Sequence, residues 1–420
     1  MGFVDPLAAI IASFCFLGIM LYKRVNLGIT LNATALSLAL LALDWQEIPK
    51  IVYATVDYST YEGQLAMATI LATFGIMLLS QLYRETGVIN RLSESLSRII
   101  QNPKIVSSAL PAVIGFLPVA GGALMSAPLV DSEAEKLGLK SEKKAYVNLW
   151  FRHTIFPVYP LSQVLIITAA LTETSVPSII VRQIPVVIVM VIVGYVTSFW
   201  KVSDTKSEKN SEKVSGLNSD LKTFSVAFSP ILTTIVAVVA LDLVVFGLSK
   251  QGFDVLMATF TGLAVLIMIA KPNVHVFAKP FKSWGIYGIT LAAYGAFFLR
   301  NTMVAAGISE IFKPLITNGS VDIILLLTIV LAALGFLTGS PSGGIAISVS
   351  ILAGTLAYFS AKTAALIYIS TYLGYTIAPT HLCFTFTADY FKCSLGKVYK
   401  YVIPSFMISF TAALLIYFIF

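Results

Sequence analysis

Long apolar stretches alternate with short polar segments along almost the whole chain. A helix that crosses a bilayer needs about 20 apolar residues, and ten stretches approach or exceed that length. The spans are expected at 7–22, 27–43, 63–83, 143–173, 177–200, 223–247, 252–270, 284–300, 362–391 and 399–420. The pattern predicts an all-α polytopic membrane protein with about ten spans.

Two further apolar stretches, 105–137 and 321–360, contain Gly, Pro and Ser at their middle. The first is interrupted at Pro118–Gly122 and the second at Thr338–Gly344. Such residues end helices, and non-helical backbone inside a membrane is tolerated only where protein or water surrounds it. We therefore expect two re-entrant hairpins, in each of which two half-helices enter and leave the membrane on the same side.

The two halves of the chain share landmarks at a nearly constant separation. The separation is 220 residues over the first landmarks and 222 after two extra residues in the second half. The matching segments are Leu71–Gly75 and Leu291–Gly295, Gly87 and Gly307, Gly115–Leu117 and Gly335–Leu337, Gly121–Gly122 and Gly343–Gly344, and Thr154–Pro157 and Thr376–Pro379. In transporters, hydrophobic segments interrupted at corresponding places of two repeats indicate the substrate site.

The distribution of basic residues predicts the orientation, because cytoplasmic loops are enriched in Lys and Arg. With the N-terminus outside and both hairpins re-entrant, 21 of the 28 basic residues fall inside, 5 fall outside, and Arg152 and Arg182 lie within spans. We therefore predict a multi-pass protein of the cell membrane with both termini outside. Residues 1–201 and 223–420 then form two inverted-topology repeats, each with five spans and one hairpin, joined by a cytoplasmic linker at 202–222.

The composition agrees with this architecture. The chain is 57% hydrophobic and 12% charged, whereas soluble domains contain about 25% charged residues. Its net charge of +7 comes from loop lysines, so no nucleic-acid partner is expected. The three cysteines lack the spacing of a metal site, and we expect no cofactor and no metal other than Na⁺.

Two short amphipathic segments, Gly87–Gln101 and Gly307–Asn318, follow the third span of each half. In the first, four apolar residues between Val88 and Ile99 fall on one helical face, and three charged residues fall on the other. A helix that lies in the membrane interface has this pattern; an ordinary loop helix is the alternative.

Proline interrupts one span of each half, at Pro157 in 143–173 and at Pro379 in 362–391. A proline leaves nearby carbonyls without helical partners, and these carbonyls can bind a cation. The half-helix that restarts presents backbone N–H groups and a positive dipole end, which suit an anion. A single interruption is usually a packing kink. Two broken spans and two hairpin tips in symmetric pairs instead favour one shared site.

The candidate substrate-binding residues lie at these four interruptions. They are Gly121, Gly122, Ser126, Asn148, Arg152, His153, Thr154, Pro157, Ser342, Gly343, Gly344, Thr376, Pro379, Thr380 and His381. Oxygen-bearing side chains near the second tip could hold a coupling ion. These candidates are Thr338, Ser340, Ser342 and Thr376.

Arg152 is the arginine placed well inside a broken span. A buried arginine is costly and usually faces a cavity or a partner on a substrate path; the alternative is that its side chain extends to the inner interface. Its neighbour His153 and the distant His381 titrate near neutral pH and could relay protons. Hydrogen bonding within the membrane is the alternative for both. Arg182 lies near the outer end of its span, where extension to the interface is expected.

The segments Gly115–Asp131 and Asn148–His153 resemble an uncharacterised membrane family, domain of unknown function 401. That family looks like a member of the ion transporter superfamily, which includes divalent anion:sodium symporters and gluconate permeases. The resemblance implies a homodimer formed by a scaffold domain, with a transport domain that moves as an elevator. The symporters have Ser-Asn-Thr at both tips, whereas tip one here, Pro118–Gly122, lacks side-chain oxygens. Sodium coupling at both symmetric tips is therefore not expected, and the second tip could still hold one ion.

These patterns favour a secondary active transporter in the lipid bilayer that moves a small anion, with an organic acid as the first choice, coupled to Na⁺ or H⁺. A cation/proton antiporter is the alternative, and it would need buried carboxylates. A passive channel and an intramembrane enzyme are further alternatives. Enzyme activity is not expected, because His-Glu-x-x-His is absent and Ser342 lacks the preceding glycine of a nucleophile elbow.

Overall fold

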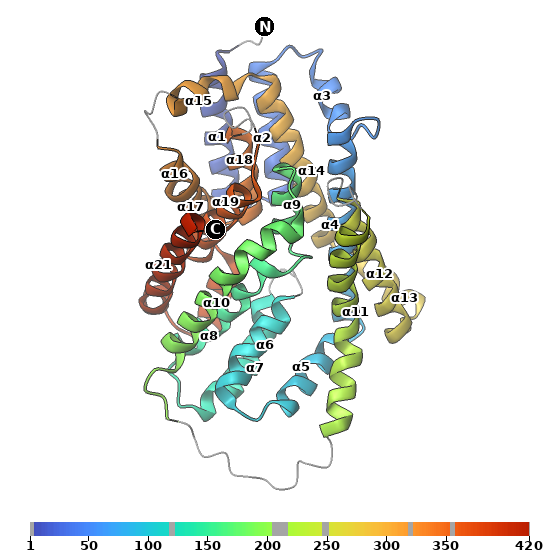
Figure 1. Ribbon diagram of the computed structural model, residues 1–420, viewed down its shortest axis with the longest axis vertical. Helices are drawn as coiled ribbons and strands as arrows, with labels where there is room; N and C mark the ends of the chain where they lie inside the picture. Colours follow the sequence, from blue (N-terminus) through green and yellow to red (C-terminus); the bar gives the residue numbers. More distant parts are fainter. Residues whose placement is uncertain are drawn as a thin grey trace.

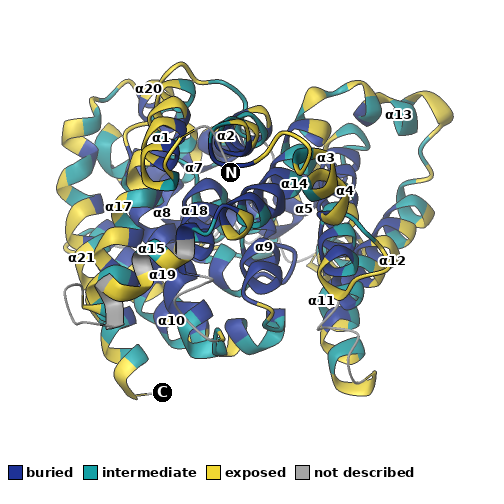
Figure 2. Ribbon diagram, turned by 90° about the horizontal axis from the view of Figure 1, so that it is seen from above, coloured by how far each residue is buried: buried dark blue, intermediate teal, exposed yellow. Residues whose placement is uncertain are grey.

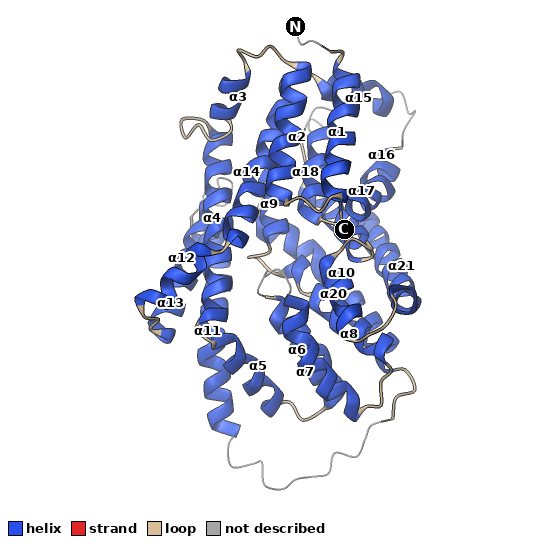
Figure 3. Cartoon of the chain, turned by 180° about the vertical axis from the view of Figure 1, so that it is seen from behind, coloured by secondary structure: helices blue, strands red, loops and turns tan. Residues whose placement is uncertain are grey.

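The computed structural model describes residues 4–116, 122–203, 217–245, 252–317, 322–352 and 358–419. Regular structure in these ranges is helical throughout (Figures 1 and 3). The elements of the first half are α1 (Pro6–Tyr22), α2 (Leu27–Ala42), α3 (Ile48–Ala54), α4 (Tyr61–Glu85), α5 (Val88–Ile99), α6 (Pro103–Gly115), α7 (Gly122–Lys136), α8 (Ser141–Thr154), the 3-10 helix η1 (Phe156–Val158), α9 (Gln163–Leu171) and α10 (Val176–Phe199).

The second half contains a similar number of elements. They are α11 (Leu217–Val244), α12 (Phe253–Ala270), α13 (Val274–Ala278), the 3-10 helix η4 (Lys279–Lys282), α14 (Trp284–Ala305), α15 (Ile308–Thr317), α16 (Ile323–Leu325), the π-helix η5 (Leu326–Val330), α17 (Leu331–Thr338), α18 (Pro341–Leu352), α19 (Ala361–Thr376), α20 (Leu382–Tyr390) and α21 (Leu395–Ile419).

The prediction of an all-α multi-pass membrane protein is confirmed. In the described part of the chain, six helical segments are long and apolar enough to cross a membrane. They are Tyr61–Glu85, Ser141–Leu171, Val176–Phe199, Leu217–Val244, Phe253–Ala270 and Leu395–Ile419. Shorter apolar helices, among them α1 and α2, accompany them.

The predicted linker 202–222 ends in a helical segment in the described residues. Helix α11 begins at Leu217, so residues 217–222 are helical, and residues 204–216 lie outside the described ranges. Asp220 on this first turn pairs with Arg98 of α5 at 3.6 Å. The ion pair stabilises the polar first turn of α11. A hydropathy pattern does not reveal such a contact, because Arg98 lies far away in the sequence.

The helices form two groups that pack mainly among themselves. In the first group α1, α2, α4, α11, α12 and α14 contact one another in pairs. In the second, α7 to α10 contact α17 to α21, and α6 packs on α7 and α8. Figure 2 shows α11 and α12 on one side of the molecule, α17 and α21 on the opposite side, and mostly buried helix between them. Helix α14 bridges the groups because it packs on α2 and α4 and also on α18.

Both stretches predicted as hairpins are interrupted helices. Helices α6 and α7 pack against each other, as do α17 and α18. In Figure 1, α6 and α7 lie toward one end of the molecule, whereas α15 and α18 lie toward the end that holds the N-terminus. The turn between α17 and α18 contains Gly339 at φ +58°, a conformation that suits glycine. The centre of the first turn, 117–121, lies outside the described residues.

Each hairpin packs on halves of two different broken helices. Helix α7 contacts α8, the first piece of the nearer broken helix, and α20, the second piece of the distant one. Helix α18 contacts α19 and α9 in the corresponding way. We call this arrangement the crossed packing. It places both hairpins and both broken helices in one body.

The amphipathic helix α5 turns its apolar face toward protein. Val88, Leu92 and Leu96 are buried, whereas Arg91 and Glu94 are exposed. The helix packs on α4, α11 and α6. Its apolar stripe is therefore covered by other helices of the same chain.

Candidate substrate site at the broken helices

The predicted breaks are present in both helices. Helix α8 ends at Thr154 and α9 begins at Gln163, with Pro157 in the 3-10 turn between them. Helix α19 ends at Thr376 and α20 begins at Leu382, with Pro379 in the turn. One interrupted carbonyl has a side-chain donor, because the Tyr399 hydroxyl donates a 2.8 Å hydrogen bond to the Ile377 carbonyl.

Arg152 lies against the first hairpin. Its side chain is 2% exposed, and a Cβ atom added at Gly122, the first residue of α7, would collide with the guanidinium. A Cβ at Gly115, the last residue of α6, would come within 2.7 Å of the Arg152 carbonyl oxygen. The guanidinium therefore ends inside the protein beside the hairpin tip, which disfavours the alternative that it extends to the interface.

Asn148 joins three helices one turn before Arg152. Its side-chain oxygen accepts a 2.6 Å hydrogen bond from the Ser126 hydroxyl of α7. Its amide donates to the Ala123 carbonyl at 3.0 Å and to the Thr387 hydroxyl of α20 at 3.1 Å. Asn148 and Ser126 thus bond to the protein itself. In this structure their polar atoms hold the first hairpin in position and are not directed at a substrate.

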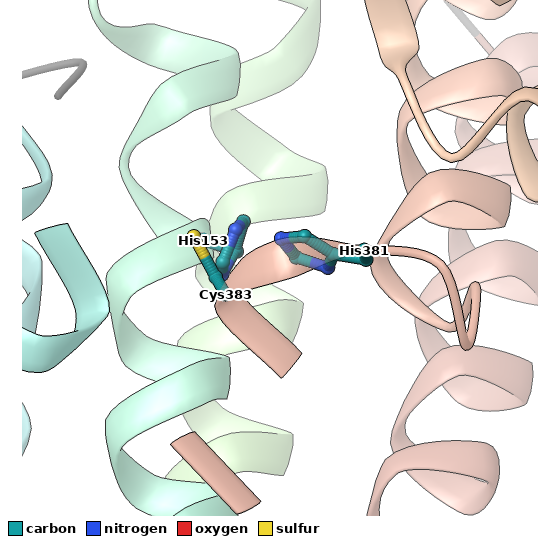
Figure 4. Close-up of side chains that lie close together, drawn as sticks. All are labelled: His153, His381 and Cys383. Carbon is teal, nitrogen blue, oxygen red and sulfur yellow. The ribbon is translucent and has the colours of Figure 1, made fainter. Parts of the chain in front are cut away.

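His153 and His381 lie side by side across the two breaks. Their ring centroids are 4.7 Å apart with the planes perpendicular, and the His381 ring is 4.0 Å from the ring of Tyr375. Both histidines are buried. Cys383, on the first turn of α20, joins them (Figure 4), and one nitrogen of each ring lies within 4.8 Å of the other and of the thiol sulfur.

The second hairpin tip packs on the second broken helix. A Cβ atom at Gly339 would collide with the Thr380 hydroxyl, and one at Gly344 would come within 2.6 Å of the Thr371 methyl group. Gly343 donates its backbone N–H to the Ser340 hydroxyl at 3.4 Å. Glycines at this tip therefore leave room for the Thr371 and Thr380 side chains of the second broken helix.

Hydroxyl groups predicted to bind the coupling ion donate to nearby carbonyls. Thr376 donates to Leu373 at 2.6 Å, and Thr338 lies 2.8 Å from the Ser340 carbonyl. Thr154 donates in the same way to Phe151 at 2.8 Å. A hydroxyl oxygen that donates its proton still has acceptor capacity, so the arrangement is compatible with ion binding through oxygen.

Several buried polar atoms between the first break and α19 have no hydrogen-bond partner among the described residues. They belong to Gln163, Ser370 and Thr371, and the hydroxyls of Ser162 and Tyr368 face each other beside them. These residues lie at the N-terminus of α9 and on α19, two helices that contact each other and α18. Because buried polar atoms are normally bonded, this cluster is suited to water or to a polar ligand.

The structure thus brings most predicted residues into two adjoining regions. Gly122, Ser126, Asn148 and Arg152 meet at the first hairpin. Gly344 and Thr380 lie at the second, together with Gly339, which was not among the predicted residues. Gly121 lies outside the described residues. Sequence reasoning did not name Tyr368, Tyr372 or Cys383 as site residues. The spacing His381-x-Cys383 was the available signal for the cysteine.

Comparison with known families identifies the chain. It belongs to a family of proteins of unknown function, DUF401, whose model matches residues 7–420. This confirms the family resemblance that the motifs Gly115–Asp131 and Asn148–His153 indicated. No curated protein matches the sequence.

Proposed function

We propose that this protein is a secondary active transporter that moves a small anion, with an organic acid as the first choice, across the cell membrane. Transport is coupled to Na⁺ or H⁺ and proceeds by an elevator-type alternation between two sides. The protein acts as a homodimer in the bilayer and is not an enzyme. The substrate site lies between the two hairpin tips and the two helix breaks.

The observation that supports this proposal most directly is the contact between Arg152 and the tip of the first hairpin. A buried guanidinium beside the start of α7 places a fixed positive charge next to the positive end of a helix dipole. Such a place attracts an anion. Arginine within membrane helices commonly marks a substrate path, and its planar fork fits a carboxylate.

The ion pairs support the predicted division of the loops between two faces. Arg98 pairs with Asp220 at 3.6 Å, and Lys144 pairs with Asp131 at 2.6 Å; all four residues are predicted inside. Arg300 pairs with Glu173 at 3.1 Å, and both are predicted outside. The placement of α6–α7 and of α18 toward opposite ends in Figure 1 agrees with hairpins that open to opposite faces.

The division into two helix groups supports the elevator movement. Both hairpins and both broken helices belong to the second group, so the whole proposed site would travel together. The first group, which contains α1, α2, α4, α11, α12 and α14, is then the stationary scaffold. The scaffold would also supply the dimer contact, as the resemblance to the ion transporter superfamily implies.

A ligand screen followed by transport measurement tests the proposal. A molecule that binds the folded protein raises its thermal midpoint with concentration, so purified protein is screened against carboxylates, sulfate and phosphate, with and without Na⁺. The hit is then offered to proteoliposomes under a sodium or pH gradient. Gradient-driven uptake that Gly122→Val abolishes is expected. Flux that ignores both gradients would instead identify a channel.

One observation favours a second candidate, cation/proton exchange. Asp254, near the start of α12, carries a buried carboxylate and is 1% exposed. Buried carboxylates are the groups that such an exchanger needs. Vesicles loaded with a pH indicator distinguish the two functions. Sodium-driven proton movement that Asp254→Asn removes, in the absence of any anion effect, would favour the exchanger.

A further inference from the structure

We infer that His153, His381 and Cys383 form a binding site for a first-row transition-metal ion of the type of Zn²⁺ or Co²⁺. We call these three residues the His–Cys cluster. Their ligand atoms all lie within 4.8 Å of one another, and Figure 4 shows the two rings and the thiol gathered at one point between the helices. The inference does not depend on the proposed transport function.

The Nδ1 atom of each histidine lies near a backbone carbonyl, and this leaves its Nε2 atom for a metal. The Nδ1 atom of His153 lies 2.7 Å from the Leu149 carbonyl oxygen, and the Nδ1 atom of His381 lies 3.5 Å from the Thr376 carbonyl oxygen. A carbonyl only accepts, so each Nδ1 bears the proton and each Nε2 keeps its lone pair. Metal-binding histidines are commonly oriented by a carbonyl in this way.

A buried nitrogen without a partner is the second observation. The Nε2 atom of His381 has no hydrogen bond among the described residues, and the side chain is 1% exposed. Buried polar atoms normally have a partner. A metal ion held together with His153 and Cys383 would supply one.

The ligand types select the class of metal. Imidazole and thiolate suit Zn²⁺ and its neighbours in the first transition row, whereas Mg²⁺ and Ca²⁺ prefer oxygen. Ligand bonds of about 2.0–2.3 Å around a tetrahedral ion place ligand atoms roughly 3.4–3.7 Å apart, so the side chains close by about 1 Å on binding.

Three protein ligands leave the fourth tetrahedral position open. His153 comes from α8 of the first broken helix, whereas His381 and Cys383 come from the break and first turn of the second. A bound ion would therefore connect the two breaks directly.

Titration of purified, chelator-treated full-length protein with Co²⁺ tests the site. We expect one ion per chain, a thiolate-to-cobalt charge-transfer band in the absorption spectrum, and loss of that band when Zn²⁺ is added. Cys383→Ser removes the band. His153→Gln and His381→Gln each weaken Co²⁺ binding. The loss of affinity should exceed the roughly 10–100-fold that follows removal of a residue hydrogen-bonded to a metal ligand.

The chain supplies matched controls for both ligand types. Cys15 and Cys393 lie outside the cluster, and His275 is exposed on α13. Cys393→Ser, Cys15→Ser and His275→Gln retain the band and the affinity of the wild type. A band that survives Cys383→Ser, or one that Cys393→Ser removes, would overturn the inference.

A measurement on the unmodified protein covers the case of variants that fold poorly. Zn²⁺ should slow the reaction of Cys383 with a maleimide reagent at least tenfold while Cys393 reacts at its usual rate, read by peptide mass spectrometry. Equal reactivity of Cys383 with and without Zn²⁺ would overturn the inference, as would the absence of any cobalt binding by the wild type.

Discussion

The hydroxyl of Tyr372 donates a 2.9 Å hydrogen bond to the backbone carbonyl of His153. Tyr372 lies on α19, one turn before the second break, and His153 lies on α8 at the edge of the first. Both residues are buried. This bond ties the two broken helices together at the carbonyl where the first one begins to lose its helical pattern.

Removal of the Tyr372 hydroxyl should destabilise the contact between the two broken helices. Tyr372→Phe leaves the His153 carbonyl without a donor in a dry environment, which costs about 1–2 kcal/mol, and the thermal midpoint in detergent should fall. Tyr294→Phe is the matched control, because the Tyr294 hydroxyl bonds to the Val52 carbonyl at 3.2 Å on the exposed surface. Equal midpoints for Tyr372→Phe and Tyr294→Phe would contradict the expected role.

Side chains at the hairpin glycines should abolish transport while the protein still inserts. In Gly122→Val the new atoms meet the Arg152 guanidinium, and in Gly344→Val they meet Thr371. Uptake into proteoliposomes should be lost in both variants. Gly18→Val and Gly396→Val are the controls, because nothing lies within 4 Å of a Cβ atom at either position. Normal uptake by either hairpin variant would show that close backbone approach at that tip is unnecessary.

Arg152 should decide anion affinity. Arg152→Lys keeps the charge but loses the planar fork, so ligand binding by calorimetry should weaken about tenfold or more, which corresponds to roughly 1.4 kcal/mol. Arg152→Gln should lose binding almost completely. Arg182→Gln should change little, because Arg182 donates a 2.8 Å hydrogen bond to the Ser178 carbonyl of its own helix, away from both breaks. Wild-type affinity in Arg152→Gln would leave the half-helix N-termini as the anion site.

The two hairpins should open to opposite faces of the membrane. Single cysteines at Ser132, which follows the first hairpin tip, and at Lys362, which follows the second, report this in a background without native cysteines. A membrane-impermeant reagent should label Ser132→Cys from the inside and Lys362→Cys from the outside. Labelling of both from one side would contradict the inverted repeats.

The sequence predicts the helices well because a span is a local pattern. The helix α1 (Pro6–Tyr22), the break at Pro157 and the interruption before Ser342 each follow from residues within one turn or one span. The helical start of α11 at Leu217, within the predicted linker, does not follow from hydropathy, because its polar first turn gains a partner from α5. That partner lies far away in the sequence.

The candidate site could be predicted only in part, for the same reason. Glycines and prolines identify the interruptions, and symmetry suggests that they meet. Which pieces meet depends on packing between distant helices. Asn148 contacts Thr387, and His153 lies close to Cys383. Neither contact produces a periodic pattern in the sequence, so both become apparent only in the three-dimensional structure.

The crossed packing makes each half of the chain incomplete without the other. Helix α7 needs α20 to cover one side, and α18 needs α9. Either half expressed alone would expose buried polar and apolar surface, so it should be degraded in the cell. Two separate polypeptides ending and beginning within 204–216 should rescue each other when they are produced together. A gene for this fold could therefore be divided at the linker without loss of the site, provided that both products reach the same membrane.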